Sequence, residues 1–233
     1  MARKPPRRAS ANGGPDGAPS GEKSERERII DALMTLLADK PIERIGFAEI
    51  AREAGVSLAE LRQSFGSTLA ILAAHMKATD HAVLAGGDAD MAGEPPRERL
   101  FDVLMRRLDV LAPHKAAVKS LLRSAMRDPP LALALNALAV RSQQWMLTAA
   151  DIDAAGPRGT LRAQGLAVLF ASVLRTWVDD DDPGHARTMA ALDRALARGQ
   201  RWSGFLDDLC RIPRCAGRAR RRRDADDEDT VAA

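Results

Sequence analysis

The sequence predicts an all-α protein of about nine helices. Its 233 residues are 45% hydrophobic, yet only 3% are aromatic and tyrosine is absent. A core built mainly from leucine, alanine, valine, isoleucine and methionine favours helices over strands. Apolar residues also recur at helical spacing, and proline or glycine turns interrupt them.

The first two helices are marked by a cap and by turn residues. Ser24 and Glu27 form an S-x-x-E capping box ahead of an apolar stripe, which Pro41 prevents from continuing. A second, shorter stripe starts after Gly46 and ends at Gly55, where a left-handed backbone costs least. One helix is therefore expected on each side of Pro41.

A third and a fourth helix follow directly. Ser57 and Glu60 form a second capping box, and the helix that they start reaches Phe65. Gly66 then breaks the chain, and Ser67 caps a run from residue 68 to about residue 84.

Five longer helices are expected after the GGDADMAGEPP loop. Proline and glycine turns separate them, at Pro113, Asp128–Pro130, Gly156–Pro157 and Asp182–Gly184. The predicted ranges are 96–112, 114–127, 130–152, 158–180 and 184–208.

Composition divides the chain into four segments. Residues 1–23 are rich in Pro, Gly, Ser and basic side chains without apolar periodicity, so we expect a disordered basic arm. In residues 210–233 a block of arginine precedes a block of acid, which predicts a disordered charged tail. Between them we expect a helix-turn-helix domain over 24–85 and a larger helical domain over 86–209.

The stretch IAREAGVSLAELRQSF, from Ile50 to Phe65, has the pattern of two short helices joined by a glycine turn. In a helix-turn-helix the second helix enters the major groove of DNA, so it is apolar at the back and polar in front. Arg62 is the best candidate for a contact with phosphate or guanine, and Gln63 can bind adenine. Because segment 24–85 holds seven basic and nine acidic residues, any DNA contact depends on a few side chains. The alternative is a solvated helix face in a protein without DNA binding.

The segment RERIIDALMTLLADKPIERIGFAEIAREAGVSLAELRQSFGSTLAIL resembles the amino-terminal domain of the TetR family of bacterial transcriptional regulators. The resemblance implies a homodimeric repressor that binds a palindromic operator in double-stranded DNA. A ligand-binding and dimerisation domain would follow, with the last two long helices packing between subunits and a small apolar ligand releasing the operator. The residues expected at the DNA interface are Gly46, Ser57, Leu58, Ala59, Arg62, Gln63, Ser64 and Thr68.

Three positions depart from the usual pattern of that family. Arg62 stands where the family has tyrosine, Ser64 where it has histidine, and Thr68 where it has lysine. Arg62 can replace the missing phenol with a stronger phosphate contact, and Thr68 can still donate a hydrogen bond.

A second resemblance supports an alternative function. The segment LRAQGLAVLFASVLRTWVDDDDPGHARTMAALDRAL is similar to part of the ubiquinone-biosynthesis accessory proteins, which use a TetR-like fold to bind lipid. The shared features are Trp177 followed by acidic residues, Thr188, and the run from Leu192 to Arg194. On this alternative the protein binds lipid and does not bind DNA.

Methionine and aromatic side chains in the second half are candidates for lining a ligand pocket, because they shape adaptable apolar sites. Plain core packing is the alternative for each of them. The candidates are Met105, Met126, Trp145, Met146, Phe170 and Trp177.

No catalytic or metal site is expected. The histidines at 75, 81, 114 and 185 are scattered, and no serine or cysteine lies in a nucleophile motif, so an enzyme is not predicted. Cys210 and Cys215 lack further zinc ligands and are expected as reduced thiols in a cytoplasmic protein. The run Asp179–Asp182 is expected to be a solvated turn without metal. No cofactor and no membrane span are predicted.

Overall fold

The computed structural model describes residues 23–87, 91 and 93–209, with side chains described as far as Gly199. This part of the chain consists of nine α-helices joined by loops and short 3-10 turns, without a β-strand, as the sequence predicts. The predicted arm up to residue 22, the tail from residue 210 and both cysteines lie outside the described residues.

The helices follow the predicted order closely. They are α1 (Glu25–Asp39), α2 (Phe47–Ala54), α3 (Leu58–Ser64), α4 (Thr68–Ala85), α5 (Pro96–Leu111), α6 (Lys115–Ala125), α7 (Pro129–Ala149), α8 (Gly156–Trp177) and α9 (Ala186–Leu209). Two 3-10 turns, η1 (Ile42–Arg44) and η3 (Ala112–His114), lie in connections for which the sequence predicted no helix of their own.

Several predicted ends of the long helices are wrong by two or three residues, whereas both ends of α5 agree to within one residue. The helix α7 ends at Ala149 rather than 152, because Asp151 takes a left-handed conformation with φ of 56°. Similarly, His185 has φ of 50°, and α9 begins only after it. Prolines lie near such turns, but they do not specify which residue takes the left-handed conformation beside the helix end or start.

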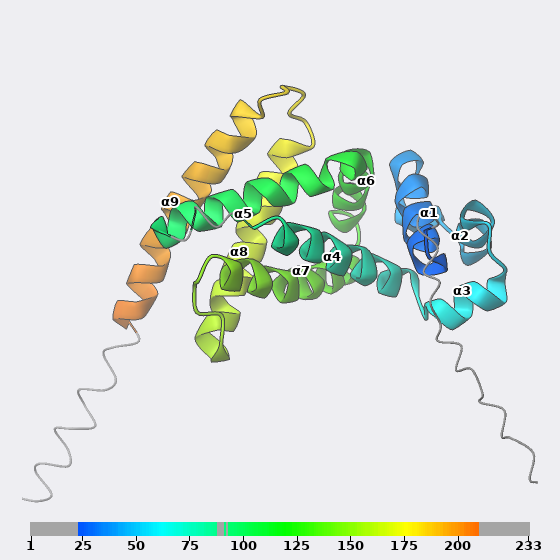
Figure 1. The fold of residues 1–233 in the computed structure, drawn as a ribbon, viewed down its shortest axis with the longest axis horizontal. Coiled ribbons are helices and arrows are strands. Elements are labelled where there is room, and N and C mark those ends of the chain that lie inside the picture. The colour runs from blue at the N-terminus through cyan, green and yellow to red at the C-terminus, as the bar shows by residue number, and fades with distance from the viewer. Residues whose placement is uncertain (1–22, 88–90, 92, 210–233) are drawn as a thin grey trace, which may run out of the picture.

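Helices α1 to α3 form a head at one end of the molecule, and α5 to α9 form a body at the other (Figure 1). The helix α4 runs from the head into the body. Its Ile71 and Leu72 belong to the buried cluster of the head, whereas its Val83 belongs to the cluster of the body. One helix thus connects the two cores.

The helix α6 is the second connection between head and body. Its Ala117 is buried in the cluster of the head, and Ser120 Oγ donates a hydrogen bond to the carbonyl of Lys40 at 3.1 Å. Ser124 Oγ donates to Glu43 in η1, also at 3.1 Å. The head therefore docks on the body through side chains as well as through the continuous α4.

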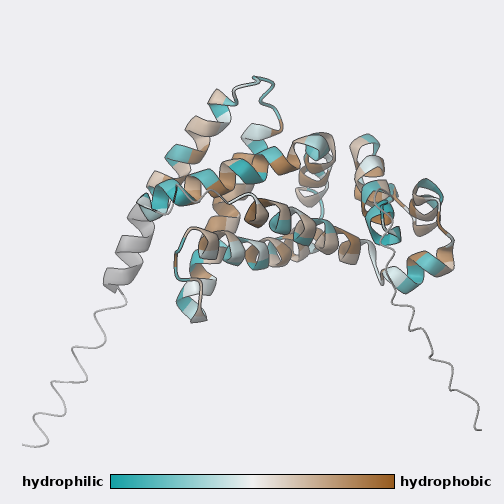
Figure 2. Ribbon diagram, viewed as in Figure 1, coloured by the Kyte–Doolittle hydropathy of each residue, from teal (hydrophilic) through white to brown (hydrophobic). Residues whose placement is uncertain are grey.

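Apolar residues lie mainly where the helices of the body face one another (Figure 2). The body cluster includes Leu104, Leu108, Met146, Trp177 and Leu192, each with at most 1% of its surface exposed. None of the described helices is long and apolar enough to cross a membrane.

Candidate nucleic-acid interface and ligand cavity

A tight turn joins α2 to α3 in the head. Gly55 ends α2 with φ of 64° and ψ of 38°, a left-handed conformation that an L side chain rarely adopts. The amide of Val56 then donates to the carbonyl of Ala51 at 3.0 Å. Ser57 and Glu60 form the predicted capping box, in which each side chain accepts a hydrogen bond from the other residue's amide. These local interactions define where α3 begins.

The back of α3 is fixed against α1. Leu61 and Phe65 are 2% and 4% exposed in the cluster of the head. The guanidinium of Arg26 lies 4.3 Å from the centre of the Phe65 ring and donates to the carbonyl of Ser64 at 2.8 Å. Ser64 Oγ donates to Glu25 Oε1 at 2.7 Å. The orientation of α3 is therefore set by residues of the first turn of α1.

The front of α3 faces solvent. Leu58 is 54% exposed, and Ala59, Arg62 and Gln63 are also exposed. Arg62 makes no hydrogen bond or ion pair with another side chain of the described chain, so its guanidinium is available to an anionic partner. Phe47 at the start of α2 is 44% exposed and was not among the interface residues predicted from the sequence.

The other predicted interface residues lie at helix starts or ends. Gly46 precedes α2 and is exposed, with no atom within 4 Å of the position of an added Cβ. Ser57 caps α3. Thr68, the first residue of α4, is half-buried. Ser64 is also half-buried, and its hydroxyl proton is donated to Glu25 rather than to the outside.

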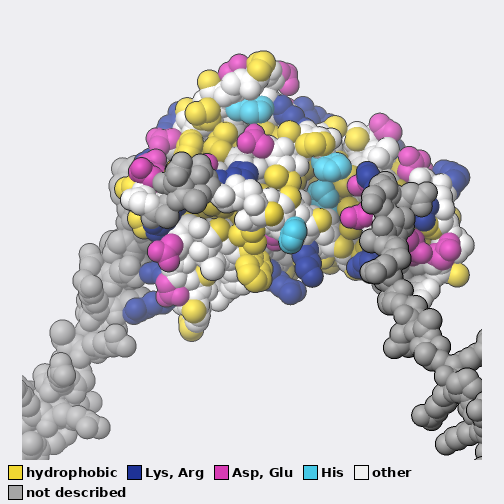
Figure 3. Space-filling model, viewed as in Figure 1, with side chains coloured by type: hydrophobic (Ala, Val, Ile, Leu, Met, Phe, Trp, Pro, Cys, Tyr) yellow, Lys and Arg dark blue, Asp and Glu magenta, His cyan; other side chains and the backbone are white. Residues whose placement is uncertain are grey.

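Several positive charges of the head are neutralised internally. Lys40 pairs with Glu49, and Lys23 pairs with Asp31. Acidic and basic side chains lie side by side on the visible face of the head (Figure 3). Attraction of the head to a phosphate backbone therefore depends on individual free cations such as Arg62.

A cavity of about 490 Å³ lies in the body, and one residue of the head reaches it. Its walls come from α4, α5, α6, α7 and α8, and Met34 of α1 also contributes. The volume is within the usual range for small-molecule sites. Most lining residues are apolar, including Leu72, Met76, Leu111, Val118, Leu121, Leu122, Leu135, Ala139, Ala167 and Leu174.

A buried ion pair lies at the wall of this cavity. Arg107 Nη1 donates to Asp80 Oδ1 at 2.5 Å, and Ser142 Oγ donates to the same oxygen at 2.6 Å. Arg107, Asp80 and Ser142 come from α5, α4 and α7 and are 4%, 8% and 3% exposed. The guanidinium lies 5.7 Å from the centre of the Phe170 ring. Three helices are thus joined beside the cavity.

Three buried polar atoms of lining residues have no hydrogen-bond partner in the described chain. They are Arg107 Nε, Gln143 Oε1 and His75 Nε2. None of these three residues was predicted from the sequence, although Arg107 gave a signal there. Arg107 shares a helical stripe with Leu104, Leu108 and Leu111, and a charge on an apolar stripe indicates a buried, partnered role.

The six predicted pocket residues occupy different places. Met126 and Phe170 line the cavity. Met146 and Trp177 are fully buried in the body cluster, and Met105 packs against that cluster. Trp145 is 58% exposed and lines a separate surface pocket together with Arg141 and Asp151.

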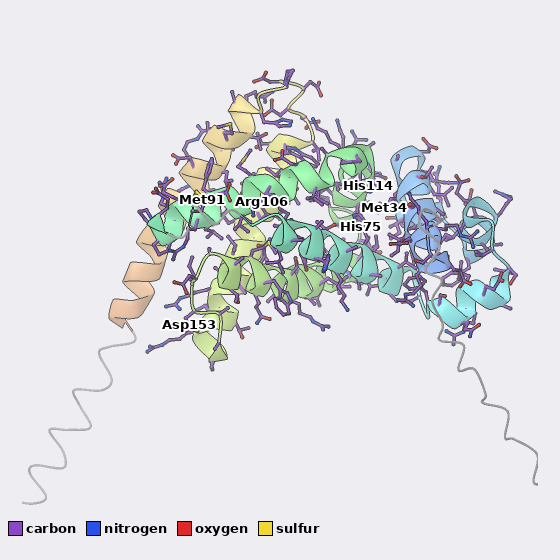
Figure 4. All side chains as sticks on the ribbon, viewed as in Figure 1. Met34, His75, Met91, Arg106, His114 and Asp153 are labelled. Atoms are coloured by element: carbon purple, nitrogen blue, oxygen red, sulfur yellow. The ribbon has the colours of Figure 1, made fainter. Side chains whose placement is uncertain are left out.

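His75 lies against His114 where α1 approaches α4 and η3. The two ring centres are 4.9 Å apart in an edge-to-face arrangement. Figure 4 shows Met34, His75 and His114 close together. Burial lowers the pKa of His75 to about 4, and the neighbouring His114 adds to the decrease. His75 is therefore neutral near pH 7.

The expectation of a solvated aspartate turn before α9 is wrong for one residue. Asp180 is 1% exposed, and its Oδ2 accepts hydrogen bonds from the amide and the hydroxyl of Thr188, at 2.9 and 2.6 Å. The sequence pattern could not show that Thr188, in the first turn of α9, donates both of these hydrogen bonds, and Asp180 Oδ1 is left without a partner in the described chain. Among the described residues no group of three His, Cys, Asp or Glu side chains could hold a metal ion.

Solved structures are similar to this fold, although no protein-family model and no curated protein matches the chain. A TetR transcriptional regulator from Nitrosomonas europaea has a TM-score of 0.59 and 22% identity, over 75% of this chain and 97% of that chain. A TetR transcriptional regulator from Rhodococcus sp. RHA1 has a TM-score of 0.54 and 20% identity, over 75% and 95%. The chain therefore has the fold of TetR-family transcriptional regulators.

Proposed function

We propose that the protein is a DNA-binding transcriptional regulator that acts as a homodimer. The observation that carries the proposal is the geometry of α3. Its back is fixed to α1, and its front presents Arg62 and Gln63 to solvent without an intramolecular partner for the guanidinium. A helix held in this way can enter a major groove, where arginine binds phosphate or guanine and glutamine binds adenine.

The proposed dimer forms through α8 and α9. The helix α8 exposes Leu161 and Val168, at 55% and 60% of their surface, and α9 exposes Met189 at 42%. A groove lined by small and charged side chains, among them Ser172 and Ala191, runs between the two helices. The same pair of helices from a second copy would bury these surfaces in a four-helix bundle. Ala191→Arg would place a long charged side chain in that groove, and we expect it to convert a dimer to a monomer in sedimentation equilibrium.

A ligand in the cavity would control the distance between the two copies of α3. The cavity touches α4, which leads directly from α3, and it touches Met34 of α1. A small apolar ligand that fits only one arrangement of these helices shifts the population toward it. Two recognition helices must lie about 34 Å apart to meet successive major grooves, so such a shift releases palindromic DNA.

The experiment is fluorescence anisotropy with labelled DNA from upstream of the protein's own gene, at two salt concentrations. Arg62→Ala is expected to weaken binding by roughly tenfold to a hundredfold. Arg158→Ala is the matched control, because it removes one exposed arginine from α8, away from the head. Binding that is absent, or equally strong on unrelated DNA, would refute the proposal, and unchanged binding by Arg62→Ala would remove Arg62 as the contact.

A second candidate is a lipid-binding accessory protein of ubiquinone biosynthesis that does not bind DNA. One observation favours it: Phe47 and Leu58 expose apolar surface at the starts of α2 and α3, where a DNA-binding face is usually polar. Mass spectrometry of the purified protein separates the candidates. Copurifying isoprenoid lipid together with no selective DNA binding supports the accessory protein.

A further inference from the structure

We propose that the cavity takes an uncharged, mainly apolar molecule with one head group that both accepts and donates hydrogen bonds, such as an alcohol or a carboxamide. The inference rests on the proposed function only in treating the cavity as a ligand site. It goes further because it identifies the head group and the two residues that would bind it, Arg107 and Gln143.

The hydrogen-bonding character of the head group follows from the unpaired atoms. Arg107 Nε is a donor that can never accept, and Gln143 Oε1 is an acceptor. Both side chains line the cavity and are at most 4% exposed. A buried polar atom without a partner is unfavourable, so a ligand that supplies both partners removes that unfavourable contribution. A group with only a donor or only an acceptor would satisfy one of the two atoms.

The absence of net charge on the ligand follows from the ion pair. The positive charge of Arg107 is already balanced by Asp80, which also accepts from Ser142. His75, which also lines the cavity, is neutral near pH 7 because burial lowers its pKa to about 4. An anionic head group would lose its hydration and lie near the Asp80 carboxylate. A cationic head group would lose its hydration and lie near the Arg107 guanidinium. Either charge would remain uncompensated in a mostly apolar site.

The position of the head group follows from exposure along the cavity wall. Met126 lines the cavity and is 65% exposed, so the cavity opens to solvent beside the end of α6. Arg107 and Gln143 line it too and are almost fully buried. A ligand that enters with its polar group first would therefore bring that group to Arg107 and Gln143. Its apolar part would contact Leu121, Leu122 and Phe170.

The test uses isothermal titration calorimetry on the full chain with four probes of equal chain length: decanol, decanamide, decanoate and decylammonium. At pH 7 decanol and decanamide are expected to bind at least about tenfold more tightly than the two ions, because tenfold corresponds to about 1.4 kcal/mol. Gln143→Met, which keeps the length of the side chain and removes the acceptor, is expected to reduce this preference. Arg107→Lys keeps a charge for Asp80 but removes Nε, and it should have the same effect.

Trp145→Ala is the control, since Trp145 lies outside the cavity, and it should bind all four probes as the wild type does. Tight binding of decanoate or decylammonium, no binding of any probe by the folded wild type, or an unchanged preference in folded Gln143→Met would each overturn the inference. The assay contains no DNA, so its result does not depend on DNA binding. Failure to find an operator would refute the proposed regulator and would leave the inference about the head group unaffected.

Discussion

Arg107 on α5 donates a hydrogen bond to Asp80 on α4, and both residues are more than nine-tenths buried. Asp80→Ala would leave the guanidinium buried without its counter-charge, which typically costs about 3–5 kcal/mol. We expect this loss in the free energy of unfolding, measured by urea denaturation at fixed protein concentration. The double variant Asp80→Ala/Arg107→Met should regain part of it, because no unpaired charge then remains.

Asp193→Ala is the matched control for that prediction. It also breaks an aspartate–arginine pair between helices, but Asp193 is 55% exposed and its partner Arg97 is 26% exposed. Exposed pairs contribute little, because water already solvates both ions. If Asp193→Ala and Asp80→Ala destabilise the protein equally, burial is not what makes the Arg107–Asp80 pair important.

Two glycines of α8 are expected to respond oppositely to substitution by alanine. At Gly159 an added Cβ would lie 2.0 Å from the carbonyl carbon of Ala154, so the backbone before the helix must move. At Gly165, which is exposed within the helix, nothing lies within 4 Å. Gly159→Ala should lower the melting temperature, whereas Gly165→Ala should stabilise the helix by up to about 1 kcal/mol. Circular dichroism melts compare the two, and a stabilising Gly159→Ala would contradict the packing described here.

Stability should decrease in acid partly because of His75. Its pKa is lowered to about 4 by burial, with His114 and Arg107 adding to the decrease and Asp31 opposing it. Between about pH 6.5 and pH 4 the unfolded chain takes up a proton on this residue that the folded chain does not. The free energy of unfolding therefore falls as the pH falls through this window.

The measurement for His75 is the free energy of unfolding between pH 7 and pH 4. His75→Gln should show a smaller decrease than the wild type, by up to about 3 kcal/mol over the window. The exposed His81→Gln serves as the control and should keep the wild-type slope. An identical slope in all three proteins would show that His75 takes up its proton equally in both states.

Gln63 is expected to control which bases are preferred. Its side chain is exposed on α3 beside Arg62, and the amide can bind adenine through two hydrogen bonds. In selection from random DNA, Gln63→Ala should relax the preference at one position of each half-site, at a cost of about 1–3 kcal/mol for the preferred base. A site preference identical to that of the wild type would exclude Gln63 from base contact.

The head was largely predictable from local sequence. The capping boxes of Ser24 and Ser57 and the left-handed Gly55 act within a few residues, so the starts of α1 and α3 and the turn between α2 and α3 follow from spacing. The outward face of α3 followed as well, because a rotation of about 100° per residue turns Gln63 to the side opposite the buried Leu61 and Arg62 to the flank. Ser64 did not follow, since its partner Glu25 lies on another helix.

The sequence by itself determined the fold class, the order of the helices and the exposed face of α3, because capping, turn conformation and helical periodicity are local properties. Only the tertiary structure decided where the cavity lies and which polar atoms face it. Asp80, Arg107 and Ser142 come from three helices and meet only when α4, α5 and α7 pack together. The contribution of these contacts to stability depends on how deeply the packed helices bury them, and no short stretch of sequence specifies that burial.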